Sequence, residues 1–454
     1  MRPIKFSLVN GDEGVYNIPM KGESERFLHK GRLVWMFVPL GLLFLLSQFY
    51  RTSSAVIALD LMRDLRLDAE SLGFLSSIFF YAFALVQFPM GAAMDLWGAK
   101  RTLVFLAIVG LGGAVIFASA QSLSAALVGR ALIGVGMACA LMGTLKLLIN
   151  WYPRNTFGTA SGLILSVGTL GVIAATAPLA EVVARLGWRA AFYGMAACHL
   201  GIVIWIVMKV RETPEGKEEA KGAPPENEEK TRASVRDFVL VFKHPSFWLI
   251  SATTFVRYGT YVAISGLWAG PFLRKIYQFS LVKSGDYLMA FPLGFILGGP
   301  IIGFVSDRIM KNRKRVVVLG MAGYSLMMIP LCLKARVLPD WLLLASFAGM
   351  GFFTSSGAVM YANIKELLPE KISGLAMAGV NFFTMIGAAT FQHGIGAFIK
   401  RISGSSVLSA ASFYWGFRLC FVASLVGVIC YLFVKEGGLV RPGEKVEVMD
   451  ARVV

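Results

Sequence analysis

The sequence is poor in charge. Only 16% of its 454 residues are Asp, Glu, Lys or Arg, and 56% are hydrophobic. A soluble globular chain carries about 25% charged residues and about 45–50% apolar ones. The composition therefore excludes a disordered protein and argues against a soluble enzyme of two or three domains.

Reactive side chains are scarce as well. The five cysteines lie singly in apolar runs and form no CxxC pair, whereas a zinc site or a disulfide framework would need them to cluster. Four histidines, without a nucleophile or a metal cluster, offer no catalytic arrangement. The sequence predicts no enzyme activity, no metal and no cofactor.

A cleavable targeting segment is also missing from the start of the sequence. Residues 1–32 are polar and lack the apolar core that a secretory signal peptide places before its cleavage site. The first long apolar run begins at Leu33, and we expect it to form an uncleaved membrane helix.

Long apolar runs are what the sequence has in abundance. A bilayer core about 30 Å thick needs about 20 apolar residues per helix. Twelve such runs cover residues 33–59, 71–94, 102–120, 123–150, 158–183, 190–209, 247–273, 286–305, 315–334, 340–366, 374–399 and 411–435. The predicted fold class is an all-α membrane protein with twelve transmembrane helices.

Polar stretches divide the runs into two groups of six. Residues 211–246 open with a mixture of acids, bases and prolines, which is typical of a linker. We predict helix bundles over 33–210 and 247–436, joined by this linker. The remaining segments, 1–32 and 437–454, are predicted to be cytoplasmic tails.

The net charge of +17 comes from 44 Lys and Arg against 27 Asp and Glu. A nucleic-acid footprint would need a compact basic face, and no polar segment is large enough to supply one. With the N-terminus inside, the basic clusters around Lys100 and Lys314 fall in cytoplasmic loops. The sequence thus predicts a functional monomer in the inner (plasma) membrane with both termini cytoplasmic, whose partners are lipid and a small-molecule substrate.

A short motif occurs twice, near the ends of the second and eighth runs. The first copy has the form GxxxDxxGxKR and consists of Gly91, Asp95, Gly98, Lys100 and Arg101. The second copy lacks the middle glycine and retains Gly303, Asp307 and Arg308; the two aspartates are 212 residues apart. With this motif the sequence resembles the major facilitator superfamily, from Leu33 to about Lys435. The resemblance implies two pseudo-symmetric six-helix bundles, alternating access, and motif residues that gate the cytoplasmic side.

Arginines inside apolar runs need a reason, because a charge at the bilayer centre costs about 2.5–3.5 kcal/mol. Arg51 lies well inside the first run, and the segment resembles the anion:cation symporters and organophosphate exchangers of the superfamily. Their arginine at this point binds a carboxylate or phosphate, which implies that Arg51 anchors substrate. Arg257, in the seventh run, is the candidate partner from the other half. The alternative for Arg51 is a structural arginine bonded to backbone carbonyls. Arg257 is 206 residues from Arg51, not 212 like the motif aspartates, so either the loop after the seventh run is longer or the two arginines lie at different depths.

Buried acids, by contrast, are absent from the positions where that branch has them. Tyr50 replaces the aspartate before the first-run arginine, and the fourth run has no glutamate, so proton coupling by that route is not expected. Other residues with a possible part in coupling are Arg130, Lys146 and His393. Polar and aromatic residues at mid-span complete the expected pocket, namely Tyr50, Tyr81, Gln87, Tyr258, Tyr261, Trp268, Asn363, Asn381 and Gln392.

These features together predict a secondary transporter of a small organic anion, a carboxylate or a phosphate ester. Two alternatives remain open. An amino-acid or short-peptide transporter would bind its carboxylate with the same arginine. A multidrug exporter is disfavoured by the missing acid in the first run.

Overall fold

The computed structural model describes residues 30–152, 154–213, 235–333, 338–403 and 408–436. Within these ranges the chain is helical and contains no β-strand, which confirms the all-α class. The predicted tails over 1–32 and 437–454 and much of the predicted linker lie outside the described residues.

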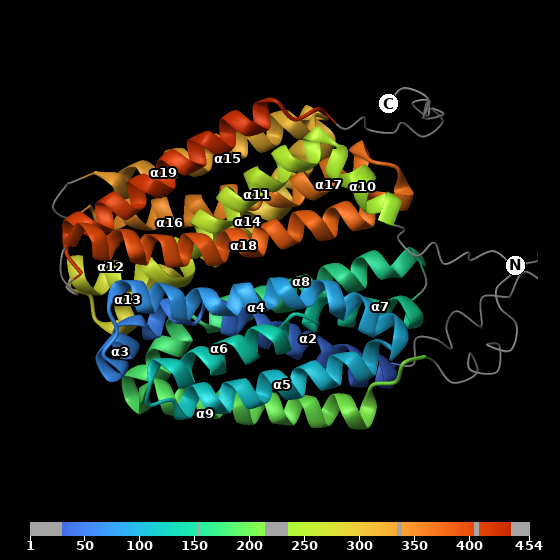
Figure 1. Ribbon diagram of the computed structural model, residues 1–454, viewed down its shortest axis with the longest axis horizontal. Coiled ribbons are helices and arrows are strands. Elements are labelled where there is room, and N and C mark those ends of the chain that lie inside the picture. The colour runs from blue at the N-terminus through green and yellow to red at the C-terminus, as the bar shows by residue number, and fades with distance from the viewer. Residues whose placement is uncertain (1–29, 153, 214–234, 334–337, 404–407, 437–454) are drawn as a thin grey trace, which may run out of the picture.

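The first half of the chain supplies the helices at the bottom of Figure 1. In chain order they are α2 (Lys30–Thr52), α3 (Ser54–Leu65), α4 (Ala69–Leu96), α5 (Ala99–Ser119), α6 (Leu123–Met137), α7 (Ala140–Trp151), α8 (Arg154–Ala174) and α9 (Ala177–Lys209). We call this the N-half. Helices α2 and α3 form one span that bends by 52°.

The second half, at the top of Figure 1, is called the C-half. It contains α10 (Val235–Lys243), α11 (Pro245–Ala263), the π-helix η2 (Ile264–Trp268), α12 (Ala269–Ile276), α13 (Leu281–Leu288), α14 (Ala290–Phe304), the π-helix η3 (Val305–Met310), α15 (Arg313–Cys332), α16 (Asp340–Thr354), α17 (Gly357–Leu367), α18 (Glu370–Ser403) and α19 (Ala410–Leu432).

Each of the twelve predicted runs coincides with helix. Ten helices in the described residues are long and apolar enough to cross a membrane, and the bent pair α2–α3 makes eleven. The run over 247–273 is helical through α11, η2 and α12 but less apolar, because it holds Arg257 among several threonines. Helix α9 is interrupted at Gly187, where φ is 80°, and this break separates the fifth run from the sixth.

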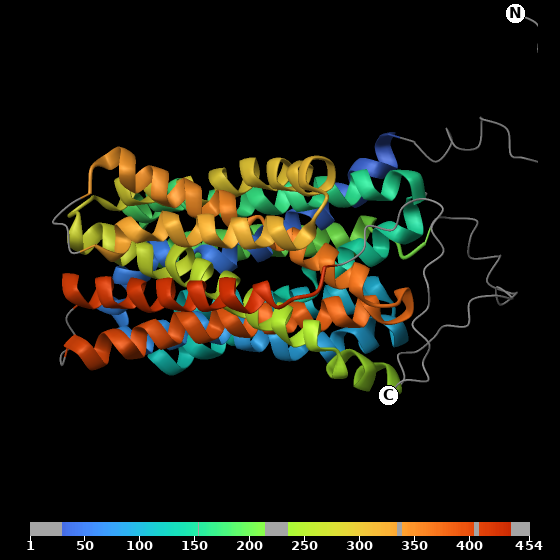
Figure 2. The same cartoon turned by 90° about the horizontal axis from the view of Figure 1, so that it is seen from above.

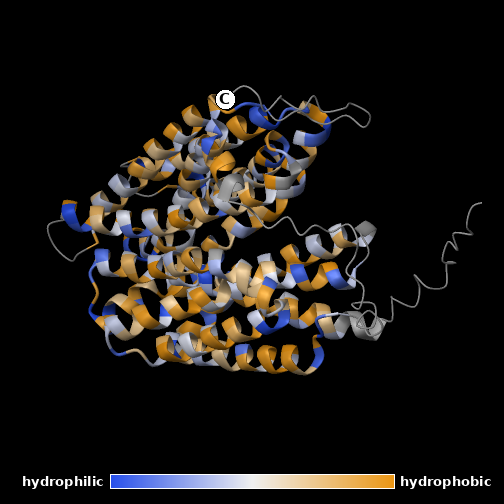
Figure 3. Ribbon diagram, turned by 45° about the vertical axis from the view of Figure 1, so that its right-hand side comes forward, coloured by the Kyte–Doolittle hydropathy of each residue, from blue (hydrophilic) through white to orange (hydrophobic). Residues whose placement is uncertain are grey.

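The two ends of the bundle are distinct. The start of α2, the end of α9 and helix α10 lie at one end, on the right in Figures 1 and 2. We call it the linker end, formed by residues 95–99, 209–213, 243–245, 307–313 and 433–436. The loop end is opposite, formed by residues 66–70, 120–122, 186–189, 274–281, 338–340, 400–402 and 408–409. Hydrophobic residues colour most of the helices between these ends (Figure 3), as a bilayer requires.

Glycine allows close helix packing inside each half. A Cβ on Gly136 of α6 would lie 2.3 Å from the Cα of Gly110 in α5. A Cβ on Gly294 of α14 would lie 1.9 Å from the carbonyl oxygen of Ala348 in α16. Small residues let helix backbones approach in membranes, where close packing replaces the hydrophobic effect as the attraction between helices.

The halves also pack backbone to backbone near the loop end. A Cβ on Gly396 of α18 would lie 2.4 Å from the carbonyl oxygen of Ala69, at the start of α4. One on Gly270 of α12 would lie 1.8 Å from the carbonyl oxygen of Ala55 in α3. In Figure 3 the ribbons of the two halves run close together at this end and diverge toward the linker end.

Candidate functional site

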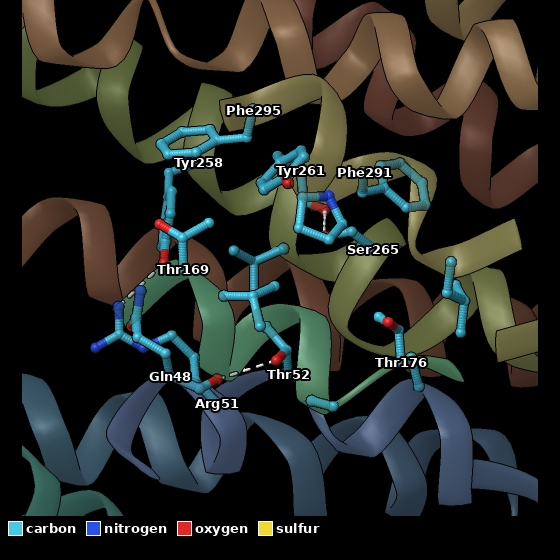
Figure 4. Close-up of a pocket in the computed structure, with 16 residues that line it drawn as sticks. Gln48, Arg51, Thr52, Thr169, Thr176, Tyr258, Tyr261, Ser265, Phe291 and Phe295 are labelled. Carbon is cyan, nitrogen blue, oxygen red and sulfur yellow. Dashed lines mark hydrogen bonds between the residues drawn. The ribbon is translucent and has the colours of Figure 1, made fainter. Parts of the chain in front are cut away.

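A pocket lies between the two halves at mid-depth (Figure 4). The space between its walls, counted together with its opening to solvent, is about 700 Å³. The N-half lines it with Gln48, Arg51, Thr52, Ala55, Thr169, Val172, Ala175 and Thr176. The C-half lines it with Tyr258, Tyr261, Val262, Ser265, Leu288, Phe291, Pro292 and Phe295.

Arg51 lies in the last turn of α2 and extends into this pocket. Its Nη1 donates a hydrogen bond to the Tyr258 hydroxyl at 3.2 Å, and its guanidinium lies 4.9 Å from the centre of the Phe83 ring. Its Nε is enclosed and has no hydrogen-bond partner among the described residues. A positive charge at a helix C-terminus is stabilised by the helix dipole.

The bend beyond Arg51 is held by a second arginine. Arg130 of α6 is 1% exposed; its Nη1 donates to the Tyr50 carbonyl at 2.9 Å and its Nη2 to the Ser54 hydroxyl at 2.6 Å. The rings of Phe79 and Phe117 flank it. A backbone carbonyl freed at a helix break inside a membrane must find another donor, and Arg130 supplies one.

Arg257 is not among the residues that line the pocket. It lies in α11, is 4% exposed, and its Nη1 donates to the Thr354 carbonyl at 2.5 Å. Thr354 ends α16, immediately before the break that separates α16 from α17. A Cβ on Gly357, the first residue of α17, would lie 2.2 Å from the Arg257 Nη2, so the glycine makes room for the guanidinium.

A second polar group spans the halves beside Arg51. Asn381 of α18 donates to the Gln87 side chain of α4 at 3.1 Å, and its oxygen accepts from the Tyr361 hydroxyl at 3.2 Å. Tyr361 is close enough to both Arg51 and Arg257 to interact electrostatically with them. The structure thus brings Gln87 and Asn381 together, one predicted residue from each half.

The other predicted polar residues lie elsewhere in the core. Tyr50 is fully buried against Phe192 and His199. Trp268 donates to the carbonyl of Gln392, whose side chain donates to the carbonyl of Val262. The first bond joins η2 to α18, and the second joins α18 to α11. The remaining placements are Asn363 bonded to Tyr431, His393 against the Phe74 ring, and Tyr81 half-buried on α4.

Both copies of the repeated motif bond within their own half. Asp95 pairs with Lys146 at 2.5 Å. Asp307 pairs with Arg313, which also bonds to Glu366 at 3.0 Å. Gly98 adopts a φ of 91°, Lys100 donates to the Val207 carbonyl, and Arg101 and Arg308 are exposed. A Cβ on Gly91 or Gly303 would meet open space.

Two carboxylates at the linker end were not foreseen from the sequence. Glu212 accepts from the backbone N–H groups of Ala99 and Lys100, the first residues of α5, at 2.7 and 2.8 Å. Glu436 accepts from Arg313 and Lys314, the first residues of α15, at 2.5 and 2.9 Å. A signal was present: each half ends in a base followed by glutamate, Arg211-Glu212 and Lys435-Glu436.

Ion pairs across the halves lie at the loop end and were also not foreseen. Arg274 pairs with Asp60 at 3.5 Å. Lys400 pairs with Asp68 at 2.9 Å and with Glu70 at 2.8 Å. Burial raises the pKa of Asp68, but hydrogen bonds from Lys400 and Ser71 and the charge of Lys400 outweigh burial, so this pKa lies below its ordinary value. Asp68 is therefore ionised at neutral pH, and the pair is intact there.

Membrane-crossing helices in two halves, with a pocket between them, define a membrane transport protein. The sequence profile of the Major Facilitator Superfamily matches residues 40–285 and 251–449. The chain belongs to this superfamily, as its repeated motif predicted.

Relatives transport small anions. The chain is 24% identical over 348 residues to the "Probable sulfoacetate transporter" of Cupriavidus necator, covering 73% of this chain and 78% of the relative. It is 26% identical over 378 residues to the "Probable galactarate/D-glucarate transporter" of Escherichia coli, covering 75% and 81%. The "Ascorbate transporter, chloroplastic" of Arabidopsis thaliana is 22% identical over 346 residues, covering 72% and 62%. These names confirm the resemblance to the anion-transporting branch and agree with a transporter rather than an enzyme.

Solved structures share the fold. A bacterial homolog of the human lysosomal transporter Spinster aligns with a TM-score of 0.70 at 17% identity, over 88% of this chain and 96% of that one. A D-xylose–proton symporter aligns with a TM-score of 0.72 at 15% identity, over 88% and 97%. Both alignments confirm the predicted fold class.

Proposed function

We propose that this protein transports a small organic anion, a carboxylate or a phosphate ester, and that Arg51 binds the anionic group. The observation that carries the proposal is the charge of the pocket. Arg51 is the one charged side chain among the described residues that line it. Guanidinium is planar, permanently charged and bidentate toward oxyanions. The names of the relatives, which include carboxylates and a sulfonate, support the same class.

An amino acid or short peptide is a weaker fit. A zwitterion brings an ammonium group into the site, and burying a charge without a partner is costly. The pocket lining described here includes no Asp or Glu. A hydrophobic cationic drug fits no better, because Arg51 would repel its charge and the described lining holds no acid to pair with it.

Alternating access is the mechanism that we propose for the movement. The loop end is joined across the halves by Arg274–Asp60 and by Lys400 with its two acids. The motif aspartates at the linker end pair inside their own halves. This distribution suits a state closed at the loop end. We also propose that the linker end is cytoplasmic, in the plasma membrane, as the basic loops favour.

Anion binding to the purified protein tests the substrate class. A panel of carboxylates and phosphate esters is screened by thermal shift; a ligand at a hundred times its Kd stabilises the folded protein by about 2.7 kcal/mol. Arg51→Met should abolish the shift, and Arg51→Lys should retain part of it. Arg185→Met is the matched control, because Arg185 is exposed and pairs with Glu181. An anion that shifts Arg51→Met as much as the native protein would refute the anchor.

Accessibility of the pocket tests the mechanism. Lys400→Glu places a third negative charge beside Asp68 and Glu70, and should open the loop end. Lys283→Glu is the control, since Lys283 pairs with Asp340 at the same end but inside the C-half. The readout is alkylation of Ser265→Cys by an impermeant reagent added from the loop side, with the native cysteines replaced. Equal labelling rates in both charge variants would argue against a gate at Lys400.

A further inference from the structure

We infer that the substrate carries a single anionic group on an uncharged, partly apolar body; this inference rests on the proposed function and narrows it. The first observation is the lack of a second cation. Arg257 is committed to the Thr354 carbonyl and enclosed by Gly357. Nothing else in the described lining carries a positive charge. A second carboxylate on the substrate would therefore be desolvated without a partner, which opposes binding.

The second observation is the chemistry of the wall opposite Arg51. Phe291 and Phe295 of α14 lie across the pocket from the guanidinium (Figure 4). Leu288 and Pro292 extend this wall along α13 and α14, and Val172 faces it from α8. Such a surface gains free energy from burying hydrocarbon and offers no hydrogen bond of its own; the hydroxyls of Thr169, Thr176 and Ser265 belong to other parts of the lining.

The third observation is that the wall is rigid. The Phe291 ring stacks on Phe347 with centroids 4.3 Å apart and an interplanar angle of 21°. Tyr261 packs edge-on against the same ring at 6.0 Å. Phe291 is thus fixed from behind and from the side, and the pocket cannot replace it with a polar group by a simple rotamer change. A preformed apolar wall selects ligands by shape and polarity.

These observations separate this chain from two of its relatives, because sulfoacetate, which names the Cupriavidus necator relative, is also a dianion. Galactarate and D-glucarate, which name the Escherichia coli relative, are polyhydroxylated dianions. The inferred ligand is a monoanion with hydrocarbon at the far end. The neutral polar residues near Arg51, Gln48 and Thr52, can bond to the anionic head without adding charge.

Four six-carbon acids isolate the two features. Hexanoate is the expected ligand. Adipate replaces its terminal methyl with a second carboxylate, 6-aminohexanoate adds an ammonium group, and gluconate keeps one charge but carries hydroxyls along the chain. Hexanoate should bind at least ~tenfold more tightly than any of the other three. Shortening it to butyrate should weaken binding by roughly fourfold for each buried methylene removed.

Two variants complete the experiment, with thermal shift and competition as readouts. Phe295→Ser should lower the affinity for hexanoate and reduce the ratio of the hexanoate affinity to the gluconate affinity. Leu297→Ser, on an exposed face of the same helix, should do neither. If adipate or gluconate binds as tightly as hexanoate in an Arg51-dependent way, the inference is wrong while the proposed function stands. If no acid shows Arg51-dependent binding, both are wrong.

Discussion

The first spans of the two halves each contain an arginine and use it differently. The first span of the N-half carries Arg51, whose guanidinium reaches the pocket and bonds to the Tyr258 hydroxyl. The first span of the C-half carries Arg257, whose guanidinium is bonded to the Thr354 carbonyl. The two arginines are 206 residues apart, against 212 for the motif aspartates, so they lie at different points of the two first spans and have different neighbours.

The difference becomes intelligible when Arg130 is included. In the N-half, Arg130 on the fourth span supports the break in the first span through the Tyr50 carbonyl. In the C-half, Arg257 on the first span supports the break in the fourth span through Thr354. Each half thus contains an arginine that donates to a carbonyl at a helix break. In the N-half the donor is on the fourth span and the acceptor on the first, and in the C-half the donor is on the first span and the acceptor on the fourth. The N-half contains a further arginine, and this one faces the pocket.

The largest expected effect comes from changing the two first-span arginines. Arg51→Met should weaken anion binding by roughly one to two orders of magnitude, which corresponds to the loss of a charge-assisted pair of about 1.5–3 kcal/mol. The melting temperature of the unliganded protein should be nearly unchanged. Arg257→Lys should do the reverse, lowering stability by about 1–3 kcal/mol because a compact ammonium cannot reproduce the guanidinium contacts.

Binding isotherms and thermal melts of both variants, measured on the same preparations, give the two readouts. Arg185→Met and Lys283→Arg serve as controls at exposed positions. The comparison breaks if Arg257→Lys weakens anion binding as strongly as Arg51→Met does while its melting temperature is preserved. That result would put Arg257 in the site.

A smaller effect is expected from filling the space beside Arg257. In Gly357→Ala the new methyl would lie 2.2 Å from the Arg257 Nη2, so the guanidinium must move and its bond to Thr354 must lengthen. Overpacking of this kind costs about 1–3 kcal/mol, against a gain of up to about 1 kcal/mol in helix propensity. Gly299→Ala, on α14 with open space around it, should only gain stability. A Gly357→Ala protein that melts at or above the native temperature would contradict the tight fit.

The sequence predicted the fold well because its signals are long and repeated. Twelve apolar runs and two copies of one motif are each set by several residues, and all twelve runs are helical. The pocket was predicted in part: Arg51 and Tyr261 line it, whereas Tyr50 and Trp268 lie in the core. The length and polarity of the apolar runs in the sequence indicate which residues lie inside a span. They cannot tell whether a side chain faces the pocket or a neighbouring helix, since both surroundings are enclosed.

Contacts between segments that are far apart in the chain were even harder to predict from the sequence. Lys400 meets Asp68 across 332 positions of the chain, and a short-range pattern has no access to such a pair. Phe291, Phe295, Thr169 and Thr176 line the pocket but look like ordinary membrane-helix residues in the sequence. Glu212 and Glu436 are different, because the repeat itself contained their signal.

The two halves also differ in how the basic partners of the motif aspartates are held, Lys146 for Asp95 and Arg313 for Asp307. Arg313 is 12% exposed and bonds to both Asp307 and Glu366, whereas Lys146 and Asp95 are 37% and 77% exposed. Arg313→Gln should lower stability by about 1–3 kcal/mol because it leaves Glu366 without its partner. Lys146→Gln should cost about 0–1 kcal/mol, as for other exposed pairs. Thermal melts at low and high salt check this, and the Lys146 effect alone should fade with salt. Equal losses of stability in the two variants would show that the ion pairs of the C-half motif contribute no more than the pair of the N-half motif.

The smallest effect is expected where the halves are alike. Glu212 and Glu436 each accept two backbone N–H groups at the start of the third helix of their half. A carboxylate at a helix N-terminus satisfies free donors and opposes the helix dipole, and its loss costs about 1 kcal/mol. Glu212→Gln and Glu436→Gln should therefore lower stability by similar amounts, and the double variant by their sum, because the sites lie in different halves. Glu181→Gln, in an exposed pair on α9, should change little. If only one of the two substitutions lowers stability, the same contact contributes to the free energy of unfolding in one half and not in the other.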